Sequence, residues 1–288
     1  MKIHLLDDGS PHAKMAATLL SGLVSPLRTE AVDVMRVSTH EDCCAHGSPS
    51  VGLGLTGQSD VAAEILEGAG FPVRRKPRWD VSPPDVLEQA AAPGYDLVVC
   101  GAGCRHINHH PTTLSTNLLR ECDTSMLVVH EFDGKRPIRI LLGADGTDRS
   151  RAAVYALQSI VAPSACKIMV CSVAFIVVPA VYPVAPEQTA VGIDDVMDVL
   201  LEEVGTRDAQ RYAQELTASL ATAGFAAESH VGLGAPARVL LEEAVLGGFD
   251  LVVLGTRAPD HGHHFRLKRS ISEQVATEAP ACLAVRVR

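Results

Sequence analysis

The sequence repeats itself over most of its 288 residues, and this repetition constrains the fold more than any other feature. The stretch YDLVVCGAG at Tyr95–Gly103 returns as FDLVVLGTR at Phe249–Arg257, 154 positions later. The first apolar run, IHLLDDGS at Ile3–Ser10, returns as RILLGADGT at Arg139–Thr147. Because each copy carries the same succession of motifs, the chain is expected to contain one folding unit twice.

Each copy alternates short apolar runs with helical patterns, and the runs lack the strict alternation of a half-exposed strand. Such a succession predicts an α/β fold with right-handed crossovers, here two repeated doubly wound open parallel five-stranded sheets with helices on both faces. Strands are predicted near residues 2–6, 30–37, 71–78, 96–101 and 125–130, and near 138–144, 166–175, 225–231, 250–255 and 281–287. Helices are predicted near 11–24, 59–69, 83–92 and 114–122, and near 147–161, 194–223, 236–247 and 268–278.

A polar, turn-rich stretch, EFDGKRP at Glu131–Pro137, predicts a linker between domains at residues 1–132 and 137–288. The second copy holds about 17 more residues than the first between its first and third helices, near the proline-rich Phe175–Gly192. This exposed-looking apolar insertion could cover a ligand cleft, form a partner surface or pack as a plain loop.

The overall charge argues against several classes of partner. The formal net charge is −9, and the basic stretches at Val73–Arg78 and Phe265–Arg269 are short, so a nucleic-acid-binding face is not expected. No run reaches the roughly 18 apolar residues of a membrane helix, and the first residues do not read as an export signal. We therefore expect a cytoplasmic protein with reduced thiols, in which Cys100, Cys166, Cys171 and Cys282 are buried small apolar residues.

Ligands of open parallel sheets bind beyond the carboxyl ends of the strands, so the residues after each strand are the candidates for a site. Asp8, Gly9 and Ser10 follow the first strand of the first copy, and Asp145, Gly146 and Thr147 follow that of the second. The carboxylate can accept a hydrogen bond from a ribose or a base, the glycine permits a tight turn, and the hydroxyl can cap the next helix. Turn and cap chemistry alone would explain the same residues.

The fourth strand of each copy leads to a second candidate region. Gly101 and Gly255 end these strands, and the following helices are expected to open at Ser115-Thr116 and at Arg269-Ser270. Backbone N–H groups at a helix start attract phosphate, and a hydroxyl adds a donor.

Together with LGAP at Leu233–Pro236 and the terminal SISEQVATEAPACLAVRV, these motifs resemble the universal stress protein family, twice over nearly the whole chain. The resemblance implies a tandem member with strand order 3-2-1-4-5 and a stress-response regulatory role. It also implies intramolecular pairing of the two domains through their fifth strands, Met126–Val129 and Cys282–Val287, and allows a homo-oligomer or an unknown protein partner.

ATP or another adenine nucleotide is the cofactor that the resemblance implies. ATP-binding members carry Gly, two residues, Gly, nine residues, then Gly-Ser or Gly-Thr. Here Cys104 or Ala258 replaces the second glycine, Ser115 or Arg269 replaces the third, and the gap is ten residues. The second copy is the better candidate, and the expected site comprises Asp145, Gly146, Thr147, Gly255, Thr256, Ala258, Arg269, Ser270 and Ile271, with Asp8, Gly9, Ser10, Gly101 and Thr116 as counterparts in the first copy.

Histidines and cysteines gather in loops that could approach one another at the same end of the sheet. Thiolate and imidazole are the ligands that zinc prefers, and the candidate zinc ligands are Cys43, Cys44, His46, Cys104, His106, His109 and His110. Their spacing matches no standard zinc module, and a solvated loop whose histidines titrate near neutral pH explains them equally.

Two classes of function therefore stay open from the sequence. One is a nucleotide binder that is at most a slow ATPase, since no catalytic carboxylate pair, nucleophile elbow or Walker loop is present. The stretch GLGLTG at Gly52–Gly57 fits a dinucleotide fingerprint but lacks the strand before it. The other class is a nucleotide-free interaction or metal-sensing module that uses the histidine- and cysteine-rich loops.

Overall fold

The computed structural model describes residues 1–37, 60–76, 88–89, 92, 94–102, 114–174, 193–257 and 270–287. The N-terminal half contains β1 (Lys2–Asp7), α1 (Pro11–Leu23), β2 (Ala31–Arg36), α3 (Val61–Gly68), β3 (Val73–Arg75), β4 (Leu97–Gly101), α5 (Leu114–Glu121) and β5 (Ser125–Val129). The C-terminal half contains β6 (Ile138–Ala144), α6 (Asp148–Ile160), β7 (Cys166–Ala174), α7 (Ile193–Thr222), β8 (Ala226–Leu233), α8 (Pro236–Leu246), β9 (Leu251–Arg257), α9 (Ile271–Glu278) and β10 (Ala281–Val287). Most of the helix predicted near 83–92 and all of the insertion at Phe175–Gly192 lie outside the described residues.

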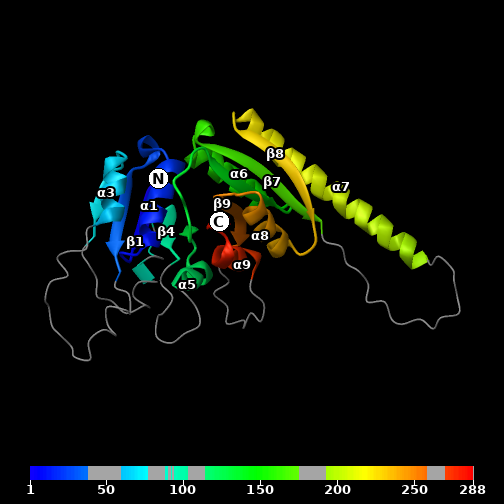
Figure 1. The fold of residues 1–288 in the computed structure, drawn as a ribbon, viewed down its shortest axis with the longest axis horizontal. Coiled ribbons are helices and arrows are strands. Elements are labelled where there is room, and N and C mark those ends of the chain that lie inside the picture. Colours follow the sequence, from blue (N-terminus) through cyan, green and yellow to red (C-terminus); the bar gives the residue numbers. More distant parts are fainter. Residues whose placement is uncertain are drawn as a thin grey trace, which may run out of the picture.

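The strands form one sheet in the order β3-β2-β1-β4-β5-β10-β9-β6-β7-β8. The predicted order 3-2-1-4-5 is confirmed in each half, with parallel pairs throughout. Where two sheets were predicted, β5 and β10 pair antiparallel, from Ala281 opposite Val129 to Ala284 opposite Met126. The two sheets therefore merge into one, through the two strands predicted at the junction, and the halves lie side by side (Figure 1).

Two apolar layers cover the sheet, one on each face. On one face α1, α3, α6 and α7 contribute the fully or almost fully buried Leu20, Leu66, Leu157 and Leu216. On the other face α5, α8 and α9 contribute Leu118, Leu240 and Val275. Each such buried side chain contributes roughly 1.5–3 kcal/mol through its removal from water. The four cysteines predicted in the core are buried, as is Cys122.

Side chains at the fifth strand of each half contact a helix of the other half. His130 after β5 contacts the carbonyl oxygen of Ala276 in α9 through Nε2 at 2.8 Å. Arg286 in β10 donates in return to the carbonyl oxygen of Leu119 in α5. Val24 and Val161, at the ends of α1 and α6, form an antiparallel bridge. The two halves therefore share strand pairing, helix ends and core.

Candidate nucleotide-binding site

The turn after β6 is built around the Asp145 carboxylate. Its Oδ1 accepts hydrogen bonds from the Thr147 backbone N–H at 3.0 Å and from the Thr147 hydroxyl at 2.6 Å. Arg149 Nη2 lies 3.3 Å from the other carboxylate oxygen. Burial alone would raise the pKa of Asp145, but these hydrogen bonds and the Arg149 charge hold that pKa below its usual value. Asp145 is therefore ionised near neutral pH, and its half-exposed side chain can accept further hydrogen bonds.

Gly146 has φ 72°, in the left-handed region that favours glycine, and so does its counterpart Gly9. The ring of Tyr212 from α7 packs against Gly146, since an added Cβ would lie 2.6 Å from that ring. Helix α7 therefore packs directly against the Asp145 turn through Tyr212.

The same turn follows β1 in the N-terminal half, with one additional carboxylate. Asp8 Oδ1 accepts from the Ser10 backbone N–H at 3.0 Å, as Asp145 does from Thr147. Asp7, which is 3% exposed, accepts from the Gly9 N–H at 2.8 Å. Burial raises the pKa of Asp7, although the Gly9 hydrogen bond and the charge of Arg36 oppose that rise. The C-terminal half has Ala144 in the place of Asp7.

Gly255 and Gly101 are required by packing inside the protein. A Cβ on Gly255 would lie 2.0 Å from the carbonyl oxygen of Arg149, in the first turn of α6. A Cβ on Gly101 would lie 2.7 Å from backbone atoms of His12 and Ala13, in the first turn of α1. Each glycine therefore lets the first helix of its half cross closely over the end of the fourth strand, which brings the Asp145 turn beside Gly255.

Three hydroxyl groups connect the end of β9 to the start of α9. Ser270 caps the helix, because its Oγ accepts from the Glu273 N–H at 3.2 Å. The Ser270 N–H in turn donates to the Glu273 carboxylate. Ser272 Oγ lies 3.1 Å from Ser270 Oγ and 3.2 Å from Thr256 Oγ1. Ile271 stands in the same turn, 44% exposed.

Two residues of this region were not predicted from the sequence: Ser272, which is the middle member of the chain of hydroxyls, and Arg286, which contacts Thr256. Arg286 Nη1 is 3.3 Å from Thr256 Oγ1, and the guanidinium also donates to the carbonyl oxygens of Arg257 and Leu119. Desolvation lowers the pKa of Arg286, although Cys122, Asp123 and Glu273 oppose this effect. The serine could have been recognised as a hydroxyl in the first turn of the helix, whereas Arg286 is distant in sequence.

Thr116 and Ser270, predicted as counterparts, differ in position relative to their helices. Ser270 precedes α9, whereas Thr116 is the third residue of α5 and is 7% exposed. The helix starts differ because α5 begins at Leu114, closer to Gly101 than Ile271 is to Gly255. The Ser10 hydroxyl does cap α1, accepting from the Ala13 N–H at 3.3 Å, while Thr147 makes no such side-chain cap.

Several predicted residues lie outside the described part of the chain. They are Ala258 and Arg269 of the expected nucleotide site and all the candidate zinc ligands, Cys43, Cys44, His46, Cys104, His106, His109 and His110. Among the residues that are described, no group of three or more metal-ligating side chains comes together. No helix in the described ranges is long and apolar enough to cross a membrane.

Comparison with solved structures shows the same fold in proteins that match along the whole chain. A universal stress protein from Archaeoglobus fulgidus DSM 4304 aligns with a TM-score of 0.63 at 13% identity, over 99% of this chain and 96% of that one. A functionally unknown protein from Pseudomonas aeruginosa PAO1 aligns with a TM-score of 0.58 at 16% identity, over 99% and 92%.

A shorter relative, a universal stress protein family protein from Arabidopsis thaliana with AMP bound, covers 53% of this chain and 93% of its own. This alignment has a TM-score of 0.34 at 12% identity, which is too low to transfer the position of the AMP to this chain. No curated protein matches the sequence significantly.

The family assignment rests on the sequence of the C-terminal half. The model of the universal stress protein family matches residues 138–286, which is just over half of the chain. The matched segment runs from β6 to β10 and includes both the Asp145 turn and the capped start of α9. The chain therefore belongs to the universal stress protein family.

Proposed function

We propose that the C-terminal half binds one adenine nucleotide at the carboxyl ends of β6 and β9. The observation that carries this proposal is the convergence of an ionised carboxylate, a close-packed glycine and a hydroxyl-lined helix start at one edge of the sheet. In open parallel sheets this edge is where ligands bind, beside the point at which the strand order reverses. Here β6 has β7 on one side and β9 on the other, so the reversal falls between β6 and β9.

Each group has a role that fits its chemistry. Asp145 accepts hydrogen bonds from ribose hydroxyls, because it is ionised and half-exposed. The hydroxyls of Thr256, Ser270 and Ser272 donate to phosphate oxygens at the start of α9, where the helix dipole also favours negative charge.

We propose a binding function and not an efficient enzyme. At the described part of this edge, hydrogen bonds with Thr147 and Arg149 hold the Asp145 carboxylate ionised and oriented. The neighbouring carboxylates are also engaged, Glu273 by the Ser270 N–H and Arg120, and Asp148 by Arg151. Efficient phosphoryl transfer needs groups that position both the nucleophile and the transferred phosphate. At most slow ATP hydrolysis is expected.

The role that follows is regulatory, in a stress response. Arg286 connects the hydroxyl chain at Thr256 to Leu119 in α5 of the N-terminal half. A ligand at α9 that attracts either Thr256 or Arg286 would therefore alter a contact between the halves. We propose that this contact conveys nucleotide occupancy to protein partners.

We also propose that the chain is a tandem of two domains, residues 1–132 and 137–288. The N-terminal domain is the weaker nucleotide site, because Thr116 is buried within the first turn of α5, whereas Ser270 caps α9 from the position before the helix.

Calorimetric titration of ATP and AMP into the full chain tests the site. Asp145→Asn should weaken binding by about tenfold or more, because a hydrogen bond to a charged group is worth roughly 1.5–3 kcal/mol. Asp8→Asn is the matched control in the N-terminal half and should leave the tight site unchanged. Equal losses in both variants, or none in either, would contradict the assignment to the C-terminal half.

A further inference from the structure

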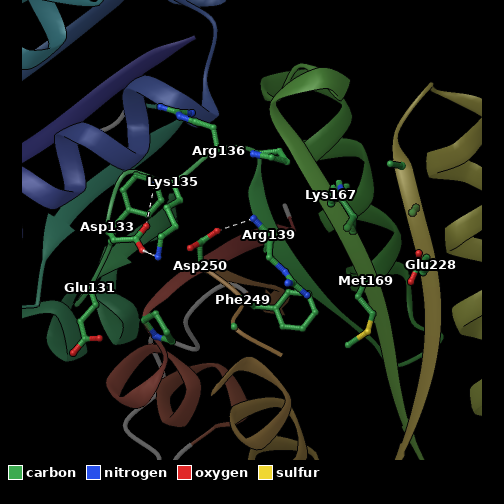
Figure 2. Close-up of a pocket in the computed structure, with 17 residues that line it drawn as sticks. Glu131, Asp133, Lys135, Arg136, Arg139, Lys167, Met169, Glu228, Phe249 and Asp250 are labelled. Atoms are coloured by element: carbon green, nitrogen blue, oxygen red, sulfur yellow. Dashed lines mark hydrogen bonds and ion pairs between the residues drawn. The ribbon is translucent and has the colours of Figure 1, made fainter. Parts of the chain in front are cut away.

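A cavity of about 1040 Å³ opens at the opposite edge of the C-terminal half, at the amino ends of β6, β7 and β8 (Figure 2). Its walls come from the interdomain stretch at Glu131–Pro137, from the starts of these strands, and from the residues before β9 and β10. Because the strands of this half are parallel, the cavity and the Asp145 turn lie at opposite ends of the sheet. A volume of this size suits a small organic molecule.

Two cations stand side by side on the floor of this cavity. Arg139 of β6 lies opposite Lys167 of β7 in the strand register, and both side chains are exposed. Neither makes an ion pair with any carboxylate of the described residues. Like charges on facing positions of neighbouring strands destabilise a sheet, and an anion between them would reverse that effect.

The Arg139 guanidinium is held in place by an aromatic ring. Its carbon lies 5.1 Å from the centroid of the Phe249 ring, a cation–π contact. The Arg139 backbone N–H donates to the Asp250 carboxylate at 2.7 Å, so both ends of the residue are fixed (Figure 2). A planar guanidinium that is already oriented suits bidentate recognition of carboxylate or phosphate oxygens.

The equivalent position in the N-terminal half is arranged differently. Lys2 of β1 repeats the backbone contact of Arg139, since its N–H donates to Asp96 at 2.8 Å. However, Lys2 faces Ala31 on the neighbouring strand, and its ammonium pairs with Glu30 at 3.3 Å. In the C-terminal half, Lys167 stands where Ala31 would be and Cys166 where Glu30 would be. Compared with the N-terminal half, the C-terminal half therefore has an additional cation, Lys167, and lacks a carboxylate at the position of Glu30.

Carboxylates on the cavity walls limit the size of the anion. Glu131 and Asp133 lie on the interdomain side, where Asp133 pairs with Lys135, Glu228 lies on β8, and Asp250 accepts from the Arg139 backbone N–H (Figure 2). A polyanion such as nucleic acid would meet these negative charges. Met169, two residues after Lys167 and partly exposed, adds apolar surface beside the two cations.

We propose that this cavity binds a small molecule that carries one oxyanion group, phosphate or carboxylate, on an apolar body. The oxyanion lies between Arg139 and Lys167, and the apolar body lies against Met169. This site is separate from the nucleotide site at the other edge and does not depend on it.

Calorimetric titration of the full chain with phenyl phosphate, benzoate and inorganic phosphate tests the proposal. Phenyl phosphate or benzoate should bind at one site per chain, more tightly than inorganic phosphate because of the apolar contact. Whichever of the two organic probes binds more tightly identifies the oxyanion. The double variant Arg139→Gln with Lys167→Gln should bind at least about tenfold more weakly, since two charge-assisted contacts are removed.

The matched control is Lys2→Gln with Lys14→Gln, which removes two cations of the N-terminal half and should leave binding unchanged. Arg139, Lys167 and Lys14 are exposed and Lys2 is partly exposed, and equal thermal midpoints of the variants would show that the fold is kept. Failure of all three probes to saturate would overturn the proposal. Binding that survives in the Arg139–Lys167 variant but is blocked by saturating ATP would place the anion at the nucleotide edge and would overturn it as well.

Discussion

The packing of α6 on the end of β9 can be tested with a single methyl group. In Gly255→Ala the new Cβ would lie 2.0 Å from the carbonyl oxygen of Arg149 and 2.3 Å from its carbonyl carbon. Ordinary contacts between heavy atoms are about 3.5–4.0 Å, so the first turn of α6 would have to move by more than about 1 Å. Both atoms belong to the backbone and cannot rotate away.

Overpacking of this kind costs about 1–3 kcal/mol, and the upper end is expected where rigid backbone must yield. Gly255→Ala should therefore lower the free energy of unfolding by about 3 kcal/mol. Gly101→Ala, with its nearest backbone atoms at 2.7 Å, should lower it less. ATP binding should also weaken in Gly255→Ala, because the displaced turn of α6 carries Asp145 with it.

Urea unfolding followed by circular dichroism measures these differences. Gly205→Ala is the matched control, because a Cβ on Gly205 in α7 would meet nothing within 4 Å. Replacing glycine in a helix interior should stabilise the protein by about 0.5–1 kcal/mol. If Gly255→Ala were as stable as the unsubstituted protein, the close crossing of α6 over β9 would be refuted.

Two further predictions concern a buried histidine and a helix cap. His4 is 3% exposed, neither ring nitrogen has a hydrogen-bond partner among the described residues, and burial lowers its pKa from 6.5 to about 4. Because the unfolded chain binds this proton at higher pH than the folded one, stability should be full above about pH 6.5 and fall towards pH 4. His4→Leu, which copies Leu141 of the other half, should flatten this loss in urea unfolding between pH 7.5 and 4.5; an unchanged pH profile would rule out His4 as its source. Ser270→Ala should cost about 1 kcal/mol through loss of the α9 cap, with Ser270→Gly costing less, and equal costs measured by thermal unfolding would argue against the capping role.

The sequence predicted the fold well because the fold depends on repeated local patterns. The returning runs at Tyr95–Gly103 and Phe249–Arg257 contain the strands β4 and β9, which hold equivalent places in the sheet. The fifth strands were also identified correctly as the junction. That this junction merges two sheets into one depends on hydrogen bonding between distant segments, which no local pattern records.

The candidate site was less predictable, for reasons that particular residues illustrate. Gly255 was interpreted as a position where backbone approaches a phosphate, but the structure shows a second demand on the same glycine, the close passage of Arg149. Glycine serves both purposes, so its presence alone cannot separate them.

Polar contacts across strands were equally hidden in the sequence. His4 stacks on Tyr95 with ring centroids 4.5 Å apart, and the Tyr95 hydroxyl donates to Asp33 at 2.7 Å. Each of these residues stands in or beside an apolar run and looks like an ordinary strand residue. Arg139 and Lys167 became neighbours in the same way, through the register of β6 and β7.

The central claim is that the C-terminal half holds one adenine nucleotide at the edge formed by Asp145 and the start of α9. Native mass spectrometry of the untagged full chain with added ATP tests it most directly, because each bound nucleotide shifts the mass by a known amount. With ATP near the dissociation constant of the tight site, we expect one nucleotide per chain, and we expect its occupancy to fall in Asp145→Asn but not in Asp8→Asn. A chain that stays free of nucleotide even at high ATP, or an occupancy that is unchanged in Asp145→Asn, would contradict the assignment.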